Sequence, residues 1–401
     1  MAEIIIVDSV MGAGKTTWAI QYMNEHPEES FLFVTPYKSE CEERIPEELN
    51  YPIWTPTVKG KDHMKLDDIV ELFQSGRDIA STHALFRMYD DRCRAAIKQF
   101  DYTLILDETM CAVEEYKLVH KDDIKNLKLH RDITVGADGM ITWQGDTELD
   151  TSYNEIRNLA QNKCLFEVNN TCYIWQFPPD IFKLFKKIYI LTYMFDGSIM
   201  KPYFDMHGIS YVTKSIKKVG EKSVLVDYYK PDKAAFREKI HIYDKEDLND
   251  DRKQKKKSML SKTWMDSKSN AQAIKTIQAH IYNYFRNKMQ AKSEDIMWTT
   301  WKDKKHKLKG KGYTNGFVSC NCRSTNNYRS RHYLAYAVNM YAHPMVEHYF
   351  NQHGFSIDVN KYALSEMIQW IWRSAIRDGE DIYIYIPSKR MRELLQLWLN
   401  D

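Results

Sequence analysis

A lysine and a threonine follow a glycine-containing turn close to the start of the chain. The turn is Gly12-Ala13-Gly14, and Lys15 and Thr16 come directly after it. Small residues let a backbone fold tightly around an anion, so that successive N–H groups point at phosphate oxygens. A lysine adds a mobile charge for β- and γ-phosphates, and a threonine hydroxyl suits Mg²⁺. The phosphate-binding loop predicted here comprises Met11, Gly12, Ala13, Gly14, Lys15, Thr16 and Thr17.

This turn departs at one position from the usual phosphate-loop pattern, G-x-x-x-x-G-K-[ST]. Ser9 stands where the first glycine is expected. A chance glycine-rich turn is the alternative interpretation. However, the aliphatic run Ile4–Val7 lies just before the turn, which favours a strand, a phosphate loop and a helix in succession. A nucleotide with Mg²⁺ is therefore the expected ligand.

Two adjacent carboxylates end a second aliphatic run, farther along the chain. The run is Tyr102–Leu106, and Asp107 and Glu108 follow it. An acid at the carboxyl tip of a parallel strand, next to a phosphate loop, can support the Mg²⁺ of the nucleotide. The next acid is placed to orient and deprotonate an attacking water. A solvated acidic turn is the alternative, but it does not account for the aliphatic strand before the pair.

A third candidate segment lies near the end of the chain, where Ala363–Arg377 is predicted to be a helix. Gln369, Arg373 and Arg377 are spaced by four, which places them along one helical face. Arginines stacked in this way could reach a γ-phosphate and stabilise charge in the transition state of phosphoryl transfer. A surface helix with solvated arginines is the alternative. The flanking apolar residues favour a partly buried helix, in which arginine needs a partner.

Several polar segments could contact the phosphates of a nucleic acid. A hydroxyl and free N–H groups at a strand end can hold a phosphate, and dense lysine on a loop binds a nucleic-acid backbone. The alternative is that these segments have no ligand and serve only as a strand terminator, a solvated loop or the start of a helix. The residues predicted on these grounds are Thr35, Pro36, Lys305, Lys307, Thr325 and Asn326.

The elements that must position these residues are short aliphatic strands, each followed by a helix or a polar turn. This pattern predicts an α/β fold with parallel strands and a ligand site at their carboxyl ends. Further strands are predicted at Phe31–Val34, at Asp78–Thr82 and at Lys187–Leu191. Residues of about 112–180 are less regular and are predicted to be an insertion, with a hairpin around Asp138-Gly139. A second set of strands is expected to begin near Ser223–Asp227.

Length and composition allow two or three ordinary globular domains. The chain has 401 residues, 43% of them hydrophobic and 28% charged, and a net charge of only +2. This balance excludes a uniformly basic nucleic-acid coat. No apolar run approaches the length of a membrane span, and seven scattered cysteines do not indicate a disulfide framework. A reducing cytoplasm is the expected location.

Taken together, these segments resemble the motifs of the two-domain core of superfamily 2 helicases, and the resemblance covers almost the whole chain. It is closest to compact DEAD-like helicases of tailed bacteriophages. The last motif of that family commonly spaces its arginines by three, whereas Arg373 and Arg377 differ by four. The matching segments, in chain order, are Met11–Thr16, Thr35-Pro36, Ser81–Ala84, Asp107–Thr109, Leu191–Tyr193, Arg323–Asn326 and Gln369–Arg377.

The resemblance implies two tandem RecA-like domains with parallel sheets, residues 1–213 and 214–401, with the insertion on the first. It implies ATP hydrolysis with Mg²⁺ between the domains, to move along or unwind nucleic acid, with DNA favoured over RNA. Lys15, Asp107, Glu108, Gln369, Arg373 and Arg377 then take the catalytic roles, with Thr16 and Asp107 at the metal. Ser81, Thr82 and His83 join the nucleic-acid contacts. Phage replication, recombination or repair in the host cytoplasm, with proteins of those processes as partners, is the expected setting.

Two other classes of function share the same phosphate loop. A nucleoside or nucleotide kinase is one, although thymidine kinases are shorter and carry paired zinc cysteines that this chain lacks. An ATP-gated nucleic-acid clamp that does not unwind is the other. A packaging motor is disfavoured because no nuclease-like carboxylate domain follows the core.

Overall fold

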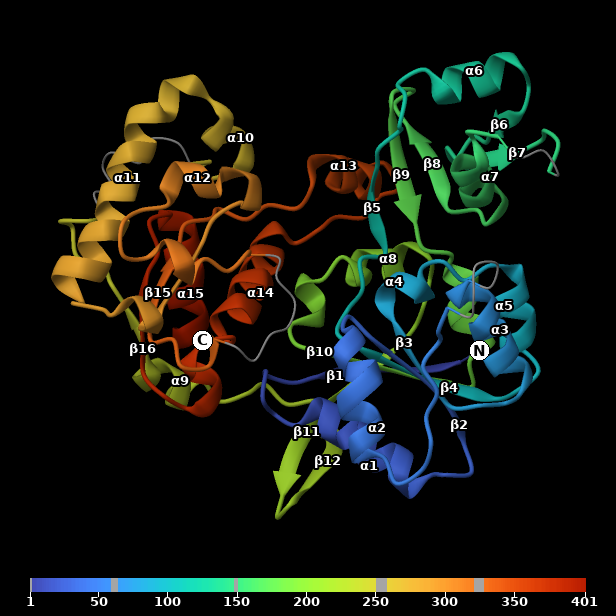
Figure 1. Cartoon of the computed structure of the whole chain (residues 1–401), viewed down its shortest axis with the longest axis horizontal. Helices are drawn as coiled ribbons and strands as arrows, with labels where there is room; N and C mark the ends of the chain where they lie inside the picture. The colour runs from blue at the N-terminus through green and yellow to red at the C-terminus, as the bar shows by residue number, and fades with distance from the viewer. Residues whose placement is uncertain (1, 59–63, 148–150, 250–257, 321–327) are drawn as a thin grey trace. The chain divides into compact units, whose positions relative to one another are not determined.

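The chain forms two compact units, which are described separately below. The computed structural model describes residues 2–58, 64–147, 151–249, 258–320 and 328–401 (Figure 1). The first unit consists of Met1–Ser9, Ala13–Tyr229 and His343–Ile357. The second consists of Val10–Gly12, Lys230–Ala342 and Asp358–Asp401. The boundary suggested by the sequence, between residues 213 and 214, falls within a strand of the first unit.

A seven-stranded sheet forms the centre of the first unit, with strand order β12-β11-β1-β10-β4-β2-β3. Every neighbouring pair is parallel except β11 and β12. The central strands are continuous apolar runs because helices cover both faces of a parallel sheet. The bounds are β1 Glu3–Asp8, β2 Ser30–Thr35, β3 Ile79–Thr82, β4 Tyr102–Asp107, β10 Lys187–Thr192, β11 Val212–Val219 and β12 Lys222–Asp227.

Short helices join these strands. On one side of the sheet, Trp18 of α1 packs edge-on against Tyr189 of β10, with ring centroids 5.0 Å apart. A five-residue π-helix, Glu40–Arg44, follows β2. The helices of the first unit outside its insertion are α1 Lys15–Glu25, α2 Ile45–Glu48, α3 Lys65–Gln74, α4 His83–Phe86, α5 Asp91–Ile97, α8 Met200–Met206 and α13 Pro344–Gln352.

The insertion predicted at about residues 112–180 forms a small sheet, β5-β9-β8, and a hairpin, β6-β7. The hairpin was expected around Asp138-Gly139, and Gly139 takes the left-handed conformation with φ of 82°. A separate group of buried side chains, including Ile124, Ile141 and Leu165, forms its core. The elements are β5 Val113–Tyr116, α6 Asp123–Leu129, β6 Ile133–Val135, β7 Ile141–Trp143, α7 Asn154–Gln161, β8 Leu165–Val168 and β9 Cys172–Gln176.

Helix α13 comes late in the sequence but belongs to the first unit, where it contacts β5, β9 and α8. The Tyr349 hydroxyl donates to the Gln176 side-chain oxygen at 2.8 Å. Asn169, in the turn between β8 and β9, contacts both His348 and Gln352. Helix α13 therefore packs against the insertion.

The strand predicted at Ser223–Asp227 is present, but the prediction that it opens a second sheet is wrong. It is β12, and it pairs antiparallel with β11 at the edge of the first sheet. Gly220, with φ of 61°, makes the tight turn between the two strands. The apolar alternation of the strand could not reveal which sheet it joins.

The second unit contains a four-stranded parallel sheet of order β13-β16-β15-β14. Trp298, Tyr284 and Phe285 are among its fully buried core side chains. The strands are β13 Ile240–Ile242, β14 Ile296–Thr299, β15 Tyr333–Tyr336 and β16 Ile382–Tyr385. The helices are α9 Ala234–Lys239, α10 Lys262–Asp266, α11 Ala271–Asn283, α12 Lys305–Leu308, α14 Val359–Ile371 and α15 Lys389–Asn400. The predicted α/β class with mainly parallel sheets is confirmed.

The prediction of one continuous helix over Ala363–Arg377 is wrong at its carboxyl end. Helix α14 ends at Ile371, and Arg377 lies in a separate 3₁₀ turn, Ala375–Asp378. The Ser374 hydroxyl donates to the Ile371 carbonyl at 2.6 Å, and Ser374 itself is extended. A serine that takes up the last helical carbonyls competes with further helical bonds. The arginines therefore do not form the stacked helical face that their spacing predicts.

None of the helices in the described ranges is both long enough and apolar enough to cross a membrane.

Candidate functional site

The predicted phosphate loop connects the carboxyl end of β1 to the amino end of α1. Gly12 and Gly14 are both left-handed, with φ of 82° and 89°. The left-handed conformation favours glycine at Gly14, and an added Cβ would lie 2.5 Å from the Ser223 hydroxyl oxygen, which would have to shift. Gly14 is the N-cap of α1, and no side chain caps that end of the helix. The first N–H groups of α1 are thus suited to an anion.

Lys15 lies against this loop. Its side chain is buried, and its ammonium group donates to the Ser9 carbonyl oxygen at 2.6 Å. A lysine is rarely buried unless its charge is compensated. The ammonium group is therefore held against the loop by the Ser9 carbonyl oxygen rather than extended into solvent.

Ser9, which replaces the first glycine of the motif, has a structural role that the sequence did not reveal. Its hydroxyl oxygen accepts a hydrogen bond from the Ile216 N–H at 2.7 Å, and its own N–H donates to the Thr192 carbonyl at 3.0 Å. These contacts connect the loop to β11 on one side and to β10 on the other. Only the position of β11 beside β1 explains why a hydroxyl is useful here, and no local sequence signal predicts that pairing.

Asp107, at the end of β4, and Thr16, in α1 just after β1, meet at the carboxyl ends of the strands, although β10 lies between β1 and β4. The Thr16 hydroxyl lies 3.3 and 3.4 Å from the two Asp107 carboxylate oxygens. Burial raises the Asp107 pKa from its ordinary value of 3.8 to about 7, and repulsion by Glu108 and Glu40 adds to the increase. Lys15 acts in the opposite direction but does not cancel it. A cation bound here would relieve this unfavourable charge.

Replacing Asp107 with asparagine is expected to stabilise the ligand-free protein. Because the folded state holds the carboxyl proton more tightly than the unfolded state, ionisation of Asp107 destabilises the fold as pH rises from about 4 to 7. We expect Asp107→Asn to raise the unfolding free energy by on the order of 2 kcal/mol at pH 8. The advantage should shrink by more than half at pH 5. Urea unfolding at both pH values measures this, with the exposed Asp101→Asn as the control; equal stability of Asp107→Asn and the parent at pH 8 would contradict it.

Glu108, the second carboxylate, is held in an unusual backbone conformation. Its φ is 67°, a left-handed value that a non-glycine residue adopts at a cost. Its N–H donates to the Leu191 carbonyl at 2.9 Å, which fixes the turn. The side chain is half-buried beside Asp107. A strained residue of this kind at a strand end is common at functional sites.

The end of β10 has a matching feature. Met194 is also left-handed, with φ of 57°. The N–H groups of Met194 and Phe195 each donate at 2.9 Å to the Asp8 carboxylate, at the end of β1. Asp8 therefore fixes the turn after β10, a role that no local sequence pattern predicts.

The residues predicted to contact nucleic acid near this edge are mostly buried. Thr35 is fully buried, and its hydroxyl has no hydrogen-bond partner among the described residues. Ser81 is buried as well, and the Thr82 hydroxyl caps α4 by accepting from the Leu85 N–H at 3.3 Å. Pro36 is half-buried. Contacts from this edge to a ligand would therefore come mainly from backbone groups.

His83 supports Asp107 instead of facing solvent. Its Nε2 lies 2.9 Å from the Asp107 carbonyl oxygen, so the proton is on Nε2 and is donated to that oxygen. The side chain is buried. In this structure His83 positions the strand end that carries the two carboxylates.

The remaining predicted residues lie in the second unit or outside the described ranges. Lys305 lies over the Phe317 ring, 4.6 Å from its centroid, and the Lys307 ammonium donates to the Met265 carbonyl. Both lysines lie in α12, so the prediction that they lie on a loop at a strand end is wrong. Thr325 and Asn326 fall outside the described residues. Gln369 lies in the last turn of α14 and is half-buried.

The two candidate arginines differ in environment. Arg373 is half-buried just after α14, and its Nε atom has no hydrogen-bond partner among the described residues. Arg377 is exposed. A guanidinium that is partly buried but incompletely bonded is the better candidate for an anionic ligand.

The residues around the loop fit a magnesium-bound nucleoside triphosphate. The uncapped start of α1 and Lys15 provide donors and positive charge for phosphates. Thr16 and Asp107 provide two adjacent oxygen ligands of the kind that Mg²⁺ prefers. Within the protein, the negative charge of the Asp107 carboxylate is poorly compensated, as its raised pKa indicates.

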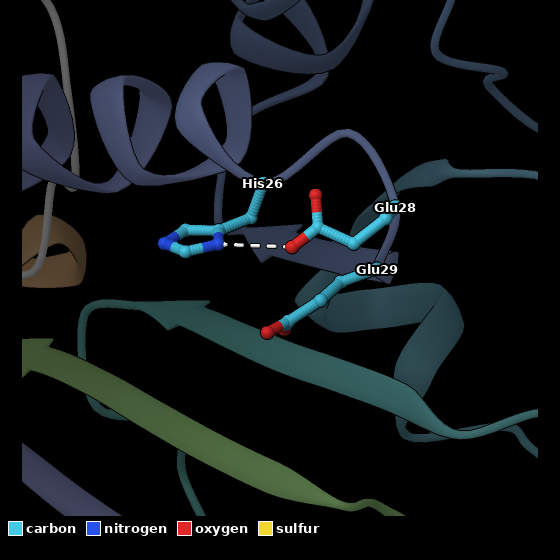
Figure 2. Close-up of side chains that lie close together, drawn as sticks. All are labelled: His26, Glu28 and Glu29. Carbon is cyan, nitrogen blue, oxygen red and sulfur yellow. Dashed lines mark hydrogen bonds and ion pairs between the residues drawn. The ribbon is translucent and has the colours of Figure 1, made fainter.

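A second group of side chains could also hold a metal ion (Figure 2). One ligand atom from each of His26, Glu28 and Glu29 lies within 4.8 Å of the others. The His26 Nδ1 atom is 3.1 Å from a Glu28 carboxylate oxygen. However, Glu29 already accepts from the hydroxyls of Tyr22 at 3.2 Å and Thr103 at 2.8 Å. These contacts join the end of α1 to β2 and β4, at the sheet edge opposite the phosphate loop.

Comparison with known proteins identifies the family. The SPbeta prophage-derived uncharacterized protein YonV of Bacillus subtilis (strain 168) is 39% identical over 417 aligned residues, which cover 100% of both chains. This chain belongs to the YonV family. The family model described as the YonV C-terminal Rossmann-like domain matches residues 234–399, and the model of the YonV middle domain matches residues 113–175. The YonV middle domain is thus the insertion, from β5 to β9.

The YonV-family chain also resembles a solved structure over nearly its full length. The structure of S. tokodaii Xpd4 covers 99% of this chain and 94% of its own, with a TM-score of 0.51 and 11% sequence identity. At this identity the likeness concerns the fold. It is consistent with the tandem RecA-like arrangement expected from the motifs.

Proposed function

We propose that this YonV-family protein is a nucleic-acid-dependent ATPase that works as a helicase or translocase. The observation that carries the proposal is the contact between the Thr16 hydroxyl and the Asp107 carboxylate, beside the buried Lys15. It joins the phosphate loop to the acidic strand end, as a magnesium–nucleotide site requires. The fold likeness to Xpd4, which has the fold of XPD-type helicases, supports the same class.

In the proposed mechanism, each residue of this edge has one task. Lys15 and the first N–H groups of α1 bind the phosphates, and Thr16 and Asp107 hold Mg²⁺. Bound ATP supplies the γ-phosphoryl group that is transferred to water, and Mg²⁺ neutralises charge on the phosphates. Glu108 accepts the proton of the attacking water. His83 and the β10 turn keep the Asp107–Glu108 segment in position.

An arginine of the second unit is proposed to complete the site during catalysis. Arg373 is the preferred candidate because its guanidinium is half-buried and its Nε is unbonded among the described residues. Positive charge at the γ-phosphate stabilises the transition state of hydrolysis. Gln369, one turn before Arg373, is proposed to assist it.

Nucleic acid is the proposed activator, with DNA favoured over RNA. The prophage origin of the YonV relative supports a role in phage replication, recombination or repair, in the cytoplasm of the bacterial host and with other proteins of those processes. Backbone groups near Pro36 and Thr82 are the proposed contacts at the edge of the first sheet, because Thr35 and Ser81 are buried.

ATP hydrolysis measured with and without single-stranded DNA, duplex DNA and RNA tests this proposal. We expect Mg²⁺-dependent hydrolysis that is stimulated by at least one nucleic acid. Lys15→Ala should abolish both hydrolysis and the stimulation, because it removes the phosphate-binding cation, while its thermal unfolding stays close to that of the parent protein. Unchanged hydrolysis in Lys15→Ala would overturn the site.

Further assays separate the alternatives. Displacement of a labelled strand from a tailed duplex distinguishes a helicase from a translocase. ATP-dependent retention on DNA without turnover would instead identify a clamp. Phosphate transfer to a nucleoside, in place of water, would identify a kinase.

A further inference from the structure

The insertion contains a groove of about 790 Å³ that none of the predicted site residues lines. It lies between α6 and the turn that joins β8 to β9. Such a volume is typical of ligand sites. Its basic side chains are Lys117, Lys121, Lys125 and Lys128.

Three of these lysines form a row along α6 and the turn before it. Lys125 and Lys128 are three residues apart and so lie on one side of α6, and Lys121 lies in the turn two residues before the helix begins. Lys125 and Lys128 are about 4.5 Å apart along the helix axis. A row of cations at this spacing suits a repeating polyanion better than a single small anion.

The four lysines of the groove differ in whether an acidic side chain already pairs with them. The Lys128 ammonium is paired with Glu167, and Lys117 lies 3.9 Å from Glu115. By contrast, Lys121 and Lys125 are exposed and have no ion pair with any described residue. Their charge is partly balanced by Asp122, which also lines the groove. The row therefore has positive charge in excess of what the groove itself neutralises.

The opposite wall of the groove provides hydrogen-bond donors. Asn170 and Thr171 are exposed in the turn between β8 and β9, where left-handed Asn169 and Asn170 make the tight hairpin. Side chains of this kind commonly donate to phosphate oxygens. Tyr116 also lines the groove, but its half-buried ring packs against the core of the insertion and its hydroxyl is hydrogen-bonded to the Glu155 side chain.

We propose that this groove binds a single strand of nucleic acid through its phosphates. Lys121 and Lys125 neutralise successive phosphates, and Asn170 and Thr171 donate to phosphate oxygens from the opposite wall. The groove lies wholly within residues 113–175, which the YonV middle domain matches, so this domain would provide a nucleic-acid contact separate from the ATP site. The inference deepens the proposed function by locating part of the nucleic-acid surface.

Equilibrium binding of a fluorescein-labelled dT20 oligonucleotide to the full chain, without ATP, tests the groove. Each phosphate contact contributes about 0.7 to the slope of log affinity against log salt for a single strand. Lys121→Ala/Lys125→Ala should therefore weaken binding and lower this slope by about 1.4. The matched control is Lys98→Ala/Lys186→Ala, which removes two exposed lysines of the same unit outside the groove.

The expected result is a reduced slope in the groove variant alone, with ATP hydrolysis in the absence of nucleic acid unchanged. An equal slope in parent, groove variant and control would overturn the groove proposal even if DNA-stimulated hydrolysis is present. The groove proposal would also be overturned if millimolar pyrophosphate displaced the oligonucleotide and the affinity did not depend on oligonucleotide length. That result would indicate a site for a small anion. If the parent hydrolyses no ATP but the slope still falls, the proposed function fails and the groove stands.

Discussion

Glu108→Gln is expected to lower the nucleic-acid-stimulated ATPase rate by about 10²–10⁴-fold. The amide keeps the size and the hydrogen-bonding shape of the side chain but cannot accept the proton of the attacking water. Binding of a fluorescent ATP analogue should change little, because Lys15, which binds the phosphates, and Thr16, which binds Mg²⁺, both remain. Steady-state hydrolysis and nucleotide binding, measured on the same preparation, check both parts.

The backbone at Glu108 provides a second variant that separates catalysis from folding. Glu108 is left-handed with φ of 67°, so glycine relieves strain there while it also removes the carboxylate. Glu108→Gly should therefore unfold at a higher temperature than the parent and still lack hydrolysis. Exposed Glu43→Gln is the control for the loss of one negative charge. Activity close to the parent value in Glu108→Gln would assign the base to another residue.

Arg373→Ala is expected to reduce hydrolysis by at least about 10²-fold and to leave nucleotide binding nearly intact. The physical reason is that a guanidinium at the γ-phosphate acts mainly in the transition state, where charge is redistributed over the phosphoryl oxygens. Because Arg373 is only half-buried and its Nε is unbonded among the described residues, truncation should leave the fold intact. The rate at saturating ATP is the quantity to measure.

Arg377→Ala is the matched control for this prediction. Arg377 lies four residues later in the same segment but is exposed, in a 3₁₀ turn outside α14. Its truncation should change the rate by less than about threefold, as is usual for a solvated surface charge. A large loss in Arg377→Ala with normal activity in Arg373→Ala would reverse the assignment of the two arginines.

The part of the site that could be predicted from sequence is the part that local patterns determine. A strand, a glycine turn and Lys15 are consecutive in the chain, and an acid that ends a parallel strand must lie at the same edge as the loop. The observed contact between Thr16 and Asp107 follows from this topology, even though β10 lies between β1, which precedes Thr16, and β4, which ends at Asp107. The parallel α/β class could be recognised for the same reason, since each apolar run is short and ends in a polar turn.

The remaining features depend on contacts between residues that are distant in sequence. Ser9 has its role because β11 lies beside β1, and neither strand encodes that pairing by itself. Likewise, the end of α14 is decided by the Ser374 hydroxyl, which competes with the next helical bond against a background of apolar residues that favours helix. The helical pattern of apolar residues therefore continues beyond Ile371, the residue at which α14 ends.

The path of the chain through α13 has a consequence for how this protein can be divided. Residues 343–357 belong to the first unit, whereas the residues on either side of them belong to the second. No single cut of the gene therefore yields either unit complete. A fragment corresponding to the C-terminal family model, residues 234–399, would carry α13 without Gln176 and Asn169, its partners in the first unit. Because the two units are interleaved in sequence, neither can be exchanged as a single continuous segment.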